Sequence, residues 1–213
     1  MKSNKSISKF QFITINHPKI SHSEQAIRAF EGGCKWVQLR MKDHSLDEIE
    51  TEINKILPIA NKHNAKLLIN DHVELVIKTN AHGVHLGKED MCPKEARNLL
   101  GNNYIIGGTA NTFEDVIKLI DSKVDYVGLG PFRFTYTKKK LNPKLGYEGY
   151  EQILFKLKIS NKKIPIIAIG GIIDTDIEKL MGSNIHGIAA AAAILEKEEI
   201  EINVQKYQQK IDA

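Results

Sequence analysis

The stretch LLINDHVELVIKTNAHGVHLGKEDM, residues 67–91, contains one complete unit of the pattern that decides the fold. The short apolar run AKLLIN (65–70) predicts a strand, and GVHL (83–86) predicts the next one. The segment between them has room for a helix, so the unit is a strand, a helix and a second strand. Both runs are apolar along their length, which is typical of parallel strands covered on both faces.

The same unit recurs along the chain. Apolar runs predict strands at 10–15, 35–40, 65–70, 83–86, 104–107, 125–130, 165–170 and 186–192. Helix-like segments lie between them, for example at 21–31, 46–63, 112–122 and 174–182. Eight strand–helix units in 213 residues predict a (β/α)8 TIM barrel, a single domain over 1–213 with a short polar N-terminal extension at 1–9. A doubly wound open sheet has the same alternation and remains the alternative.

Composition restricts the classes of partner and of compartment that we expect for this chain. Thirty Lys and Arg against 26 Asp and Glu leave a net charge of +4, spread along the chain. That balance does not indicate a nucleic-acid partner and suits an anionic small molecule. Two cysteines cannot form a disulfide framework, and neither a signal-peptide core nor an apolar stretch of membrane-spanning length is evident. We therefore expect a cytoplasmic protein without a membrane partner.

Polar side chains follow the predicted second strand at every other position. Gln38, Arg40 and Lys42 alternate with Leu39 and Met41, so the three point the same way. In a barrel the reactive groups lie at the C-terminal ends of the strands. This trio therefore suits phosphate or pyrophosphate oxygens, although a solvated strand end would have the same composition.

Two carboxylates follow the next two strands, Asp71 after Asn70 and Asp90 after Gly87. Neighbouring strand ends would bring them close to each other and to the basic trio. Mg²⁺ is commonly held by one or two carboxylates together with phosphate oxygens, so a magnesium site is one interpretation. The other is local, with Asp71 capping the helix that starts near His72 and Asp90 forming a turn before Pro93.

Small residues lie at the ends of the seventh and eighth predicted strands. Gly170-Gly171 follow the seventh strand and precede a helix whose N-terminal amides could bind an anion. The run Ala189 to Ala193 would let the eighth loop approach the same phosphate. The connection from Gly130 to Gly146 is long, and long loops in compact domains are commonly lids. Histidines and cysteines form no metal or nucleophile pattern, and we expect His85 to be structural.

These residues, in this order, resemble the thiamine phosphate synthase family. The resemblance runs from about 12 to 211 and rests on VQLRMK (37–42), the 67–91 stretch, IIGGTANT (105–112), DYVGLGPFRFTYTKKK (125–140), IPIIAIGGI (164–172) and HGIAAAAAIL (186–195). It implies a transferase that joins 4-amino-2-methyl-5-hydroxymethylpyrimidine diphosphate to 4-methyl-5-(2-hydroxyethyl)thiazole phosphate. Pyrophosphate leaves through a pyrimidine-carbocation-like step, and thiamine phosphate forms.

The resemblance also implies a role for each site residue. Arg40, Lys42, Asn70 and Lys138 would hold the diphosphate, and Asp71 and Asp90 would hold a Mg²⁺ cofactor. Gln38 would contact the pyrimidine, and Thr109 would lie beside the reacting groups, with Arg40, Lys42, Thr109 and Lys138 as the catalytic set. The thiazole phosphate would contact Thr135, Thr137, Gly171, Ala191 and Ala192.

Three positions depart from the family pattern. Thr109 and Ala192 stand where serine is common, and Phe134 stands where proline is frequent. Two relatives of the barrel remain alternatives. A thiazole tautomerase would need a histidine where this chain has Asn111, and a non-catalytic phosphate-binding barrel is suggested by Ala192 alone. A homo-oligomer is left open.

Overall fold

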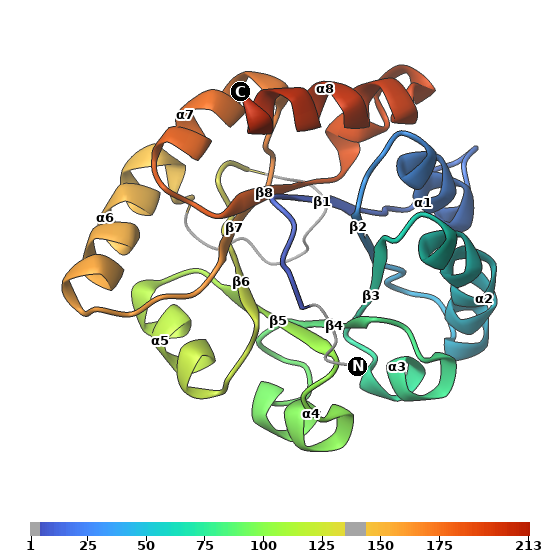
Figure 1. Ribbon diagram of the computed structural model, residues 1–213, viewed down its shortest axis with the longest axis horizontal. Helices are drawn as coiled ribbons and strands as arrows, with labels where there is room; N and C mark the ends of the chain where they lie inside the picture. The colour runs from blue at the N-terminus through green and yellow to red at the C-terminus, as the bar shows by residue number, and fades with distance from the viewer. Residues whose placement is uncertain (1–4, 135–143) are drawn as a thin grey trace.

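The computed structural model describes residues 5–134 and 144–213. Within these residues, parallel strands close into a barrel in the order β1-β2-β3-β4-β5-β6-β7-β8, and the helices form a ring around it (Figure 1). The strands are β1 (Phe10–Ile13), β2 (Trp36–Leu39), β3 (Lys66–Asn70), β4 (Gly83–Leu86), β5 (Ile105–Ala110), β6 (Tyr126–Leu129), β7 (Ile166–Ile169) and β8 (Gly187–Ala190).

The helices alternate with these strands along the chain. They are α1 (His22–Glu31), α2 (Leu46–Lys62), α3 (Val73–Thr79), α4 (Pro93–Leu100), α5 (Phe113–Asp121), α6 (Gly146–Ile159), α7 (Ile177–Gly182) and α8 (Ile200–Asp212). Three short 3₁₀ turns, η1 (Asp174–Asp176), η2 (Ala192–Ile194) and η3 (Glu196–Glu198), lie in the loops after β7 and β8. No described helix is long and apolar enough to cross a membrane.

The barrel predicted from the sequence is confirmed. β1 pairs with β8, with Phe10 opposite Ile188, which closes the sheet and rules out the open doubly wound alternative. Side chains fix two of the helix starts, since Ser45 and Thr112 each form a capping box, with Glu48 and Asp115. Three strand ends differ by two or more residues from the prediction, since β1 ends at Ile13 and β8 ends at Ala190, each two residues before the predicted end. β5 continues past 107 to Ala110, because Gly108 to Ala110 go on pairing with β6.

Two apolar layers hold the barrel together. Inside it, Trp36, Leu68, Tyr126 and Ile167 form a cluster with residues from β1, β5 and β8. A larger layer fills the space between the strands and the helix ring, where α2 buries Ile53 and its neighbours. Both layers lie beneath the C-terminal ends of the strands, so they support the loops that follow those ends.

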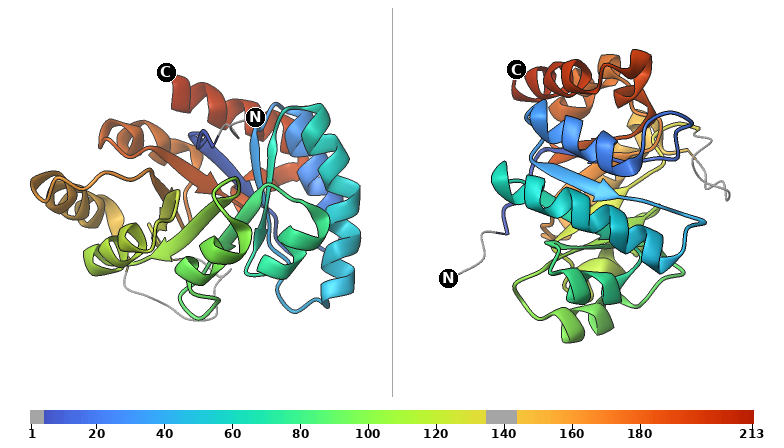
Figure 2. Two further views of the ribbon diagram at one scale, coloured as in Figure 1. Left: turned by 60° about the horizontal axis from the view of Figure 1, so that its bottom comes forward. Right: turned by 90° about the vertical axis from the view of Figure 1, so that its right-hand side faces the viewer.

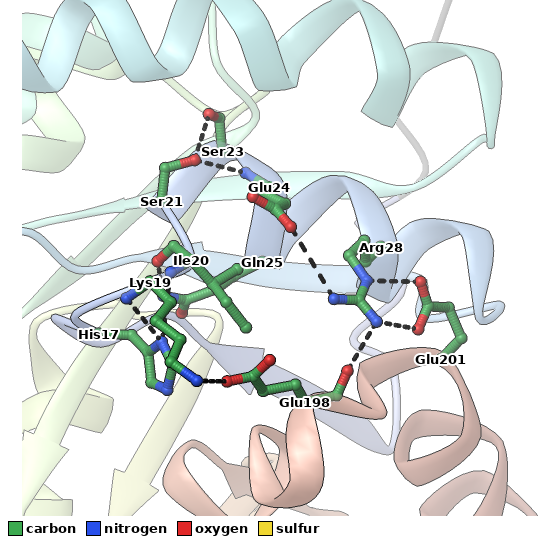
Figure 3. Close-up of polar contacts among 10 residues, drawn as sticks. All are labelled: His17, Lys19, Ile20, Ser21, Ser23, Glu24, Gln25, Arg28, Glu198 and Glu201. Atoms are coloured by element: carbon green, nitrogen blue, oxygen red, sulfur yellow. Dashed lines mark hydrogen bonds and ion pairs between the residues drawn. The ribbon is translucent and has the colours of Figure 1, made fainter.

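A polar cluster between α1 and α8 reinforces the seam where the first and last units meet (Figure 3). Arg28 donates from Nε and Nη2 to the two carboxylate oxygens of Glu201, at 2.6 and 2.8 Å. The Arg28 Nη2 also reaches the backbone carbonyl of Glu198 at 2.7 Å, and Lys19 pairs with the Glu198 carboxylate at 3.0 Å. α1 and α8 lie side by side in both views of Figure 2, and these contacts join them.

Candidate active site

The end of β2 brings two of the expected residues to the rim of the barrel. Gln38 is buried in β2, and Arg40 follows it in a partly buried position against Asp71. Burial lowers the pKa of the Arg40 guanidinium, while the negative charges of Asp71 and Asp43 raise it. Because an arginine keeps its proton at any physiological pH, Arg40 is a fixed cation at this rim.

Two carboxyl groups meet at the ends of β3 and β4. The Asp90 carboxyl lies close enough to the Asp71 carboxyl to raise its pKa, and the Lys42 ammonium lies 3.6 Å from the Asp71 carboxylate. Burial and the neighbouring Asp90 raise the pKa of Asp71 from 3.8 to about 6, so Asp71 keeps its proton under mildly acidic conditions. Asn70 is buried at the end of β3, paired in register with His85.

The alternative interpretation of these two aspartates, a helix cap at Asp71 and a turn at Asp90, is wrong for Asp71 and right for Asp90. Asp71 does not cap α3, because the N-cap position belongs to His72 and carries no side-chain hydrogen bond. Asp71 instead adopts a left-handed backbone with φ 68, an unusual conformation for an aspartate and one that directs its side chain towards Asp90. Asp90 does make a turn contact, accepting the Gly87 N–H at 2.6 Å.

A cavity of about 320 Å³ opens on the opposite part of the rim. Its wall is mostly apolar or backbone and includes Arg40, Pro131, Gly171, Ala191 and Ala192. Arg40 therefore borders both the carboxyl pair and the cavity. The expected residues Gly171, Ala191 and Ala192 do come together here. Thr135, Thr137 and Lys138 lie outside the described residues.

Gly170 and Gly171 are required by the shape of this wall. Both have positive φ, 101 and 67. A Cβ on Gly170 would lie 2.7 Å from the Pro131 Cβ, and one on Gly171 would lie 2.4 Å from the Arg133 Cγ. The loop after β6 thus packs directly on the turn after β7, and only glycine allows that approach without strain.

An ion pair that the sequence did not reveal holds this contact. Arg133 donates to both carboxylate oxygens of buried Asp176, at 2.6 and 2.8 Å, and to the Gly171 carbonyl at 2.7 Å. Asp176 in turn accepts the Ile173 N–H at 2.9 Å. The expectation of a helix N-terminus open to an anion is therefore wrong at Ile173, since an aspartate already occupies that amide.

A polar network runs through the barrel interior beneath Thr109. His85 Nε2 lies 2.9 Å from the Thr109 hydroxyl, and His85 Nδ1 lies 2.8 Å from the Tyr126 hydroxyl. Gln11 Nε2 donates to the Tyr126 oxygen at 3.3 Å, and Gln38 Nε2 donates to Gln11 Oε1 at 3.4 Å. The structural role expected for His85 thus includes contact with a site residue. The register of the barrel places His85 beside Asn70, and nothing local in the sequence pointed to Tyr126.

Comparison with known proteins adds independent findings. Residues 10–194 match the model of a family described as thiamine monophosphate synthase. A thiamine-phosphate synthase of Bacteroides thetaiotaomicron is 49% identical over 189 residues, covering 89% of this chain and 90% of the relative. One from Flavobacterium johnsoniae is 42% identical and covers 97% of both chains. The solved thiamine phosphate pyrophosphorylase of Pyrococcus furiosus superposes with a TM-score of 0.84 at 25% identity, covering 96% of this chain and 95% of that one.

Proposed function

This chain belongs to the thiamine monophosphate synthase family, and from that premise we propose how its rim performs the synthase reaction. The activity is that of a transferase that joins a pyrimidine diphosphate to a thiazole phosphate. A single observation supports the proposed site most strongly. Arg40 borders both the Asp71–Asp90 carboxyl pair and the largely apolar cavity, so two phosphorylated substrates bound on either side would meet beside it.

The diphosphate would bind on the side of β2, β3 and β4. Arg40 and Lys42 supply positive charge there, and Asn70 supplies an amide donor. Lys138 would add a further cation. When the carbon–oxygen bond of the pyrimidine diphosphate breaks, the electron pair leaves with pyrophosphate. Cations already fixed around that oxygen stabilise the developing charge without reorganising during the reaction.

The carboxyl pair fits a divalent cation. Within the described residues, no cluster of three or more acidic, histidine or cysteine side chains gathers, so the protein offers Asp71 and Asp90 together with the substrate oxygens. That donor set is the one that Mg²⁺ commonly uses, and burial together with the neighbouring Asp90 raises the pKa of Asp71, an effect that a bound cation would oppose. Bound there, Mg²⁺ would act as a Lewis acid on the leaving group.

The thiazole phosphate would lie over the cavity after β7 and β8. Gly171, Ala191 and Ala192 present backbone groups along its edge, and Thr135 and Thr137 would complete the contacts from the β6 loop. The apolar wall, which includes Ile13 and Ile169, would exclude water from the reactive carbon. Gln38 would contact the pyrimidine, and Thr109 would face the reacting bond.

The chemistry calls for positioning more than for proton transfer. The thiazole nitrogen attacks with its own lone pair, forms a carbon–nitrogen bond and becomes a thiazolium cation, so it loses no proton. Holding the nitrogen and the carbon in line contributes up to ~7–11 kcal/mol in favourable cases. The reaction therefore needs no general base at the rim.

The direct test supplies both substrates with Mg²⁺ and measures thiamine phosphate and pyrophosphate by chromatography. Equal amounts of the two products are expected. Absence of both, with isomerisation of a thiazole carboxylate phosphate supplied in a parallel assay, would overturn the proposal in favour of a tautomerase. Lys138→Ala should reduce turnover by about tenfold or more, as expected for loss of a transition-state cation, while the nearby Lys140→Ala is the matched control and should leave turnover near wild type.

A further inference from the structure

The Thr109 hydroxyl can serve the reaction in two ways. Its oxygen either donates its hydrogen to His85 Nε2, 2.9 Å away, or accepts a hydrogen from it. In the first case the hydroxyl presents only lone pairs to the substrates, and in the second it presents its hydrogen. The proton position on His85 decides between them.

The hydrogen bonds of Tyr126 fix the position of the proton on His85. Tyr126 accepts a hydrogen bond from the Gln11 amide, and Gln11 accepts one from the Gln38 amide. Tyr126 is fully buried, and burial raises its pKa, so the phenol keeps its hydrogen. Since amide N–H groups already approach the phenol oxygen, its hydrogen points to the other close partner, His85 Nδ1 at 2.8 Å.

The position of the proton on His85 then sets the donor and the acceptor in its hydrogen bond with Thr109. An Nδ1 that accepts leaves the hydrogen of a neutral imidazole on Nε2, where it points at the Thr109 oxygen. Thr109 therefore accepts from below, and its own hydrogen turns towards the rim.

We propose that His85 is a positioning residue whose Nε2–H tautomer, set by Tyr126, makes the Thr109 hydroxyl a hydrogen-bond donor to the anionic pyrophosphate side of the reacting bond. The statement about Thr109 and the substrate rests on the proposed function. The statement about the tautomer rests on the network alone. Thr109 is β-branched, which restricts its χ1 rotamers and helps to keep the hydroxyl oxygen over His85.

The first test needs no substrate. The protein labelled with ¹⁵N and ¹³C at histidine is examined by NMR in its ligand-free form, with His85→Gln used to assign the signals. We expect the His85 resonances of an Nε2–H tautomer. An Nδ1–H tautomer would overturn the proposal, and this result does not depend on whether the chain makes thiamine phosphate.

The second test separates positioning from packing. Tyr126→Phe keeps the ring in the barrel but removes the hydrogen given to His85, so kcat should fall about tenfold while KM for both substrates changes less than twofold. In a Thr109→Val protein, which has no hydroxyl to orient, adding Tyr126→Phe should cause no further loss.

Tyr150→Phe is the matched control. Tyr150 is as buried as Tyr126, and its hydroxyl bonds to the Leu129 carbonyl instead of to the network. Its removal should leave kcat near wild type. Equal losses from the two Tyr→Phe changes, or full additivity with Thr109→Val, would mean that Tyr126 acts only through packing and would overturn the proposal.

Discussion

Two halves of the rim differ in what they present to a ligand. The charged half, made of Lys42, Asn70, Asp71 and Asp90, presents side chains. The backbone half, made of Gly170, Gly171, Ala191 and Ala192, presents main-chain groups and methyl groups, and the cavity that it borders is also lined by Arg40 and Glu196.

The difference shows where each half is vulnerable. A site made of side chains changes with one substitution or with pH, because its charges belong to individual groups. A site made of backbone changes only when the fold around it moves. In the backbone half that fold is held by Arg133 and Asp176, which lie behind the cavity wall. The predictions below test this contrast.

Asp71→Asn should produce the largest effect. It removes a carboxylate from the pair that fits Mg²⁺, so turnover should fall about 100- to 1,000-fold, as for loss of a major electrostatic contribution to the transition state. Steady-state rates measured across a Mg²⁺ titration would show this. Asp121→Asn, at an exposed position on α5, is the control and should behave like the wild type. A fall of less than threefold in Asp71→Asn would remove the metal assignment.

Arg133→Ala should impair the backbone half by removing the ion pair that holds its loop in place. It leaves the buried Asp176 carboxylate without its main partner, which costs about 3 kcal/mol in the free energy of unfolding. KM for the thiazole phosphate should rise more than KM for the pyrimidine diphosphate. Urea denaturation and substrate titrations measure the two effects. Lys179→Ala, which removes a cation 4.1 Å from the Tyr147 ring centre nearby, should cost less than 1 kcal/mol, about the value of an exposed contact. Equal changes in both KM values would contradict a role confined to this half.

The charged half should also make stability depend on pH. Asp71 has its pKa raised from 3.8 to about 6, so in the metal-free protein its proton is held in the folded state and lost from the unfolded chain between those values. The stabilisation is complete below about pH 4 and disappears as pH rises through 6. Wild type and Asp71→Asn should therefore be equally stable at pH 4, and the variant should be more stable by about 2 kcal/mol at pH 7.5.

Chemical denaturation in a chelator at both pH values measures this difference. Added Mg²⁺ should then stabilise the wild type at pH 7.5 and leave Asp71→Asn unchanged. A variant that is less stable than wild type at pH 7.5 without metal would show that the carboxyl pair is not repulsive.

Ala192→Ser should produce the smallest change. Ala192 is exposed at the cavity edge, so a hydroxyl fits there without crowding. One added hydrogen bond to phosphate should lower KM for the thiazole phosphate about fivefold, equivalent to about 1 kcal/mol. Ala213→Ser, at an exposed position that does not line the cavity, is the control. No difference between the two variants would mean that the backbone half does not reach the phosphate at residue 192.

The sequence predicted those features that depend on local chemistry. Strand positions follow from apolar runs, and the Gly170-Gly171 turn follows from the only residue type that tolerates its backbone and its close contact with Pro131. The carboxyl pair could be expected from the barrel rule, because Asp71 and Asp90 end neighbouring strands.

The features that escaped prediction join residues far apart in the chain. Arg133 and Asp176 are 43 residues apart, and His85 and Tyr126 are 41 apart. Each pair depends on side-chain directions that only the closed barrel fixes. The left-handed backbone of Asp71 has no sequence signal either, since φ is positive there without a glycine.

The contacts between the first and last strand–helix units also bear on the order of events in folding. β1 pairs with β8, and Arg28 on α1 meets Glu201 on α8, so both contacts await the synthesis of residues 187–201. Until residues near 190 emerge, β1 and β7 are open sheet edges, which are prone to pair with other chains. Closing a loop of this length is slow compared with forming a helix, so barrel closure is expected to be a late event in folding.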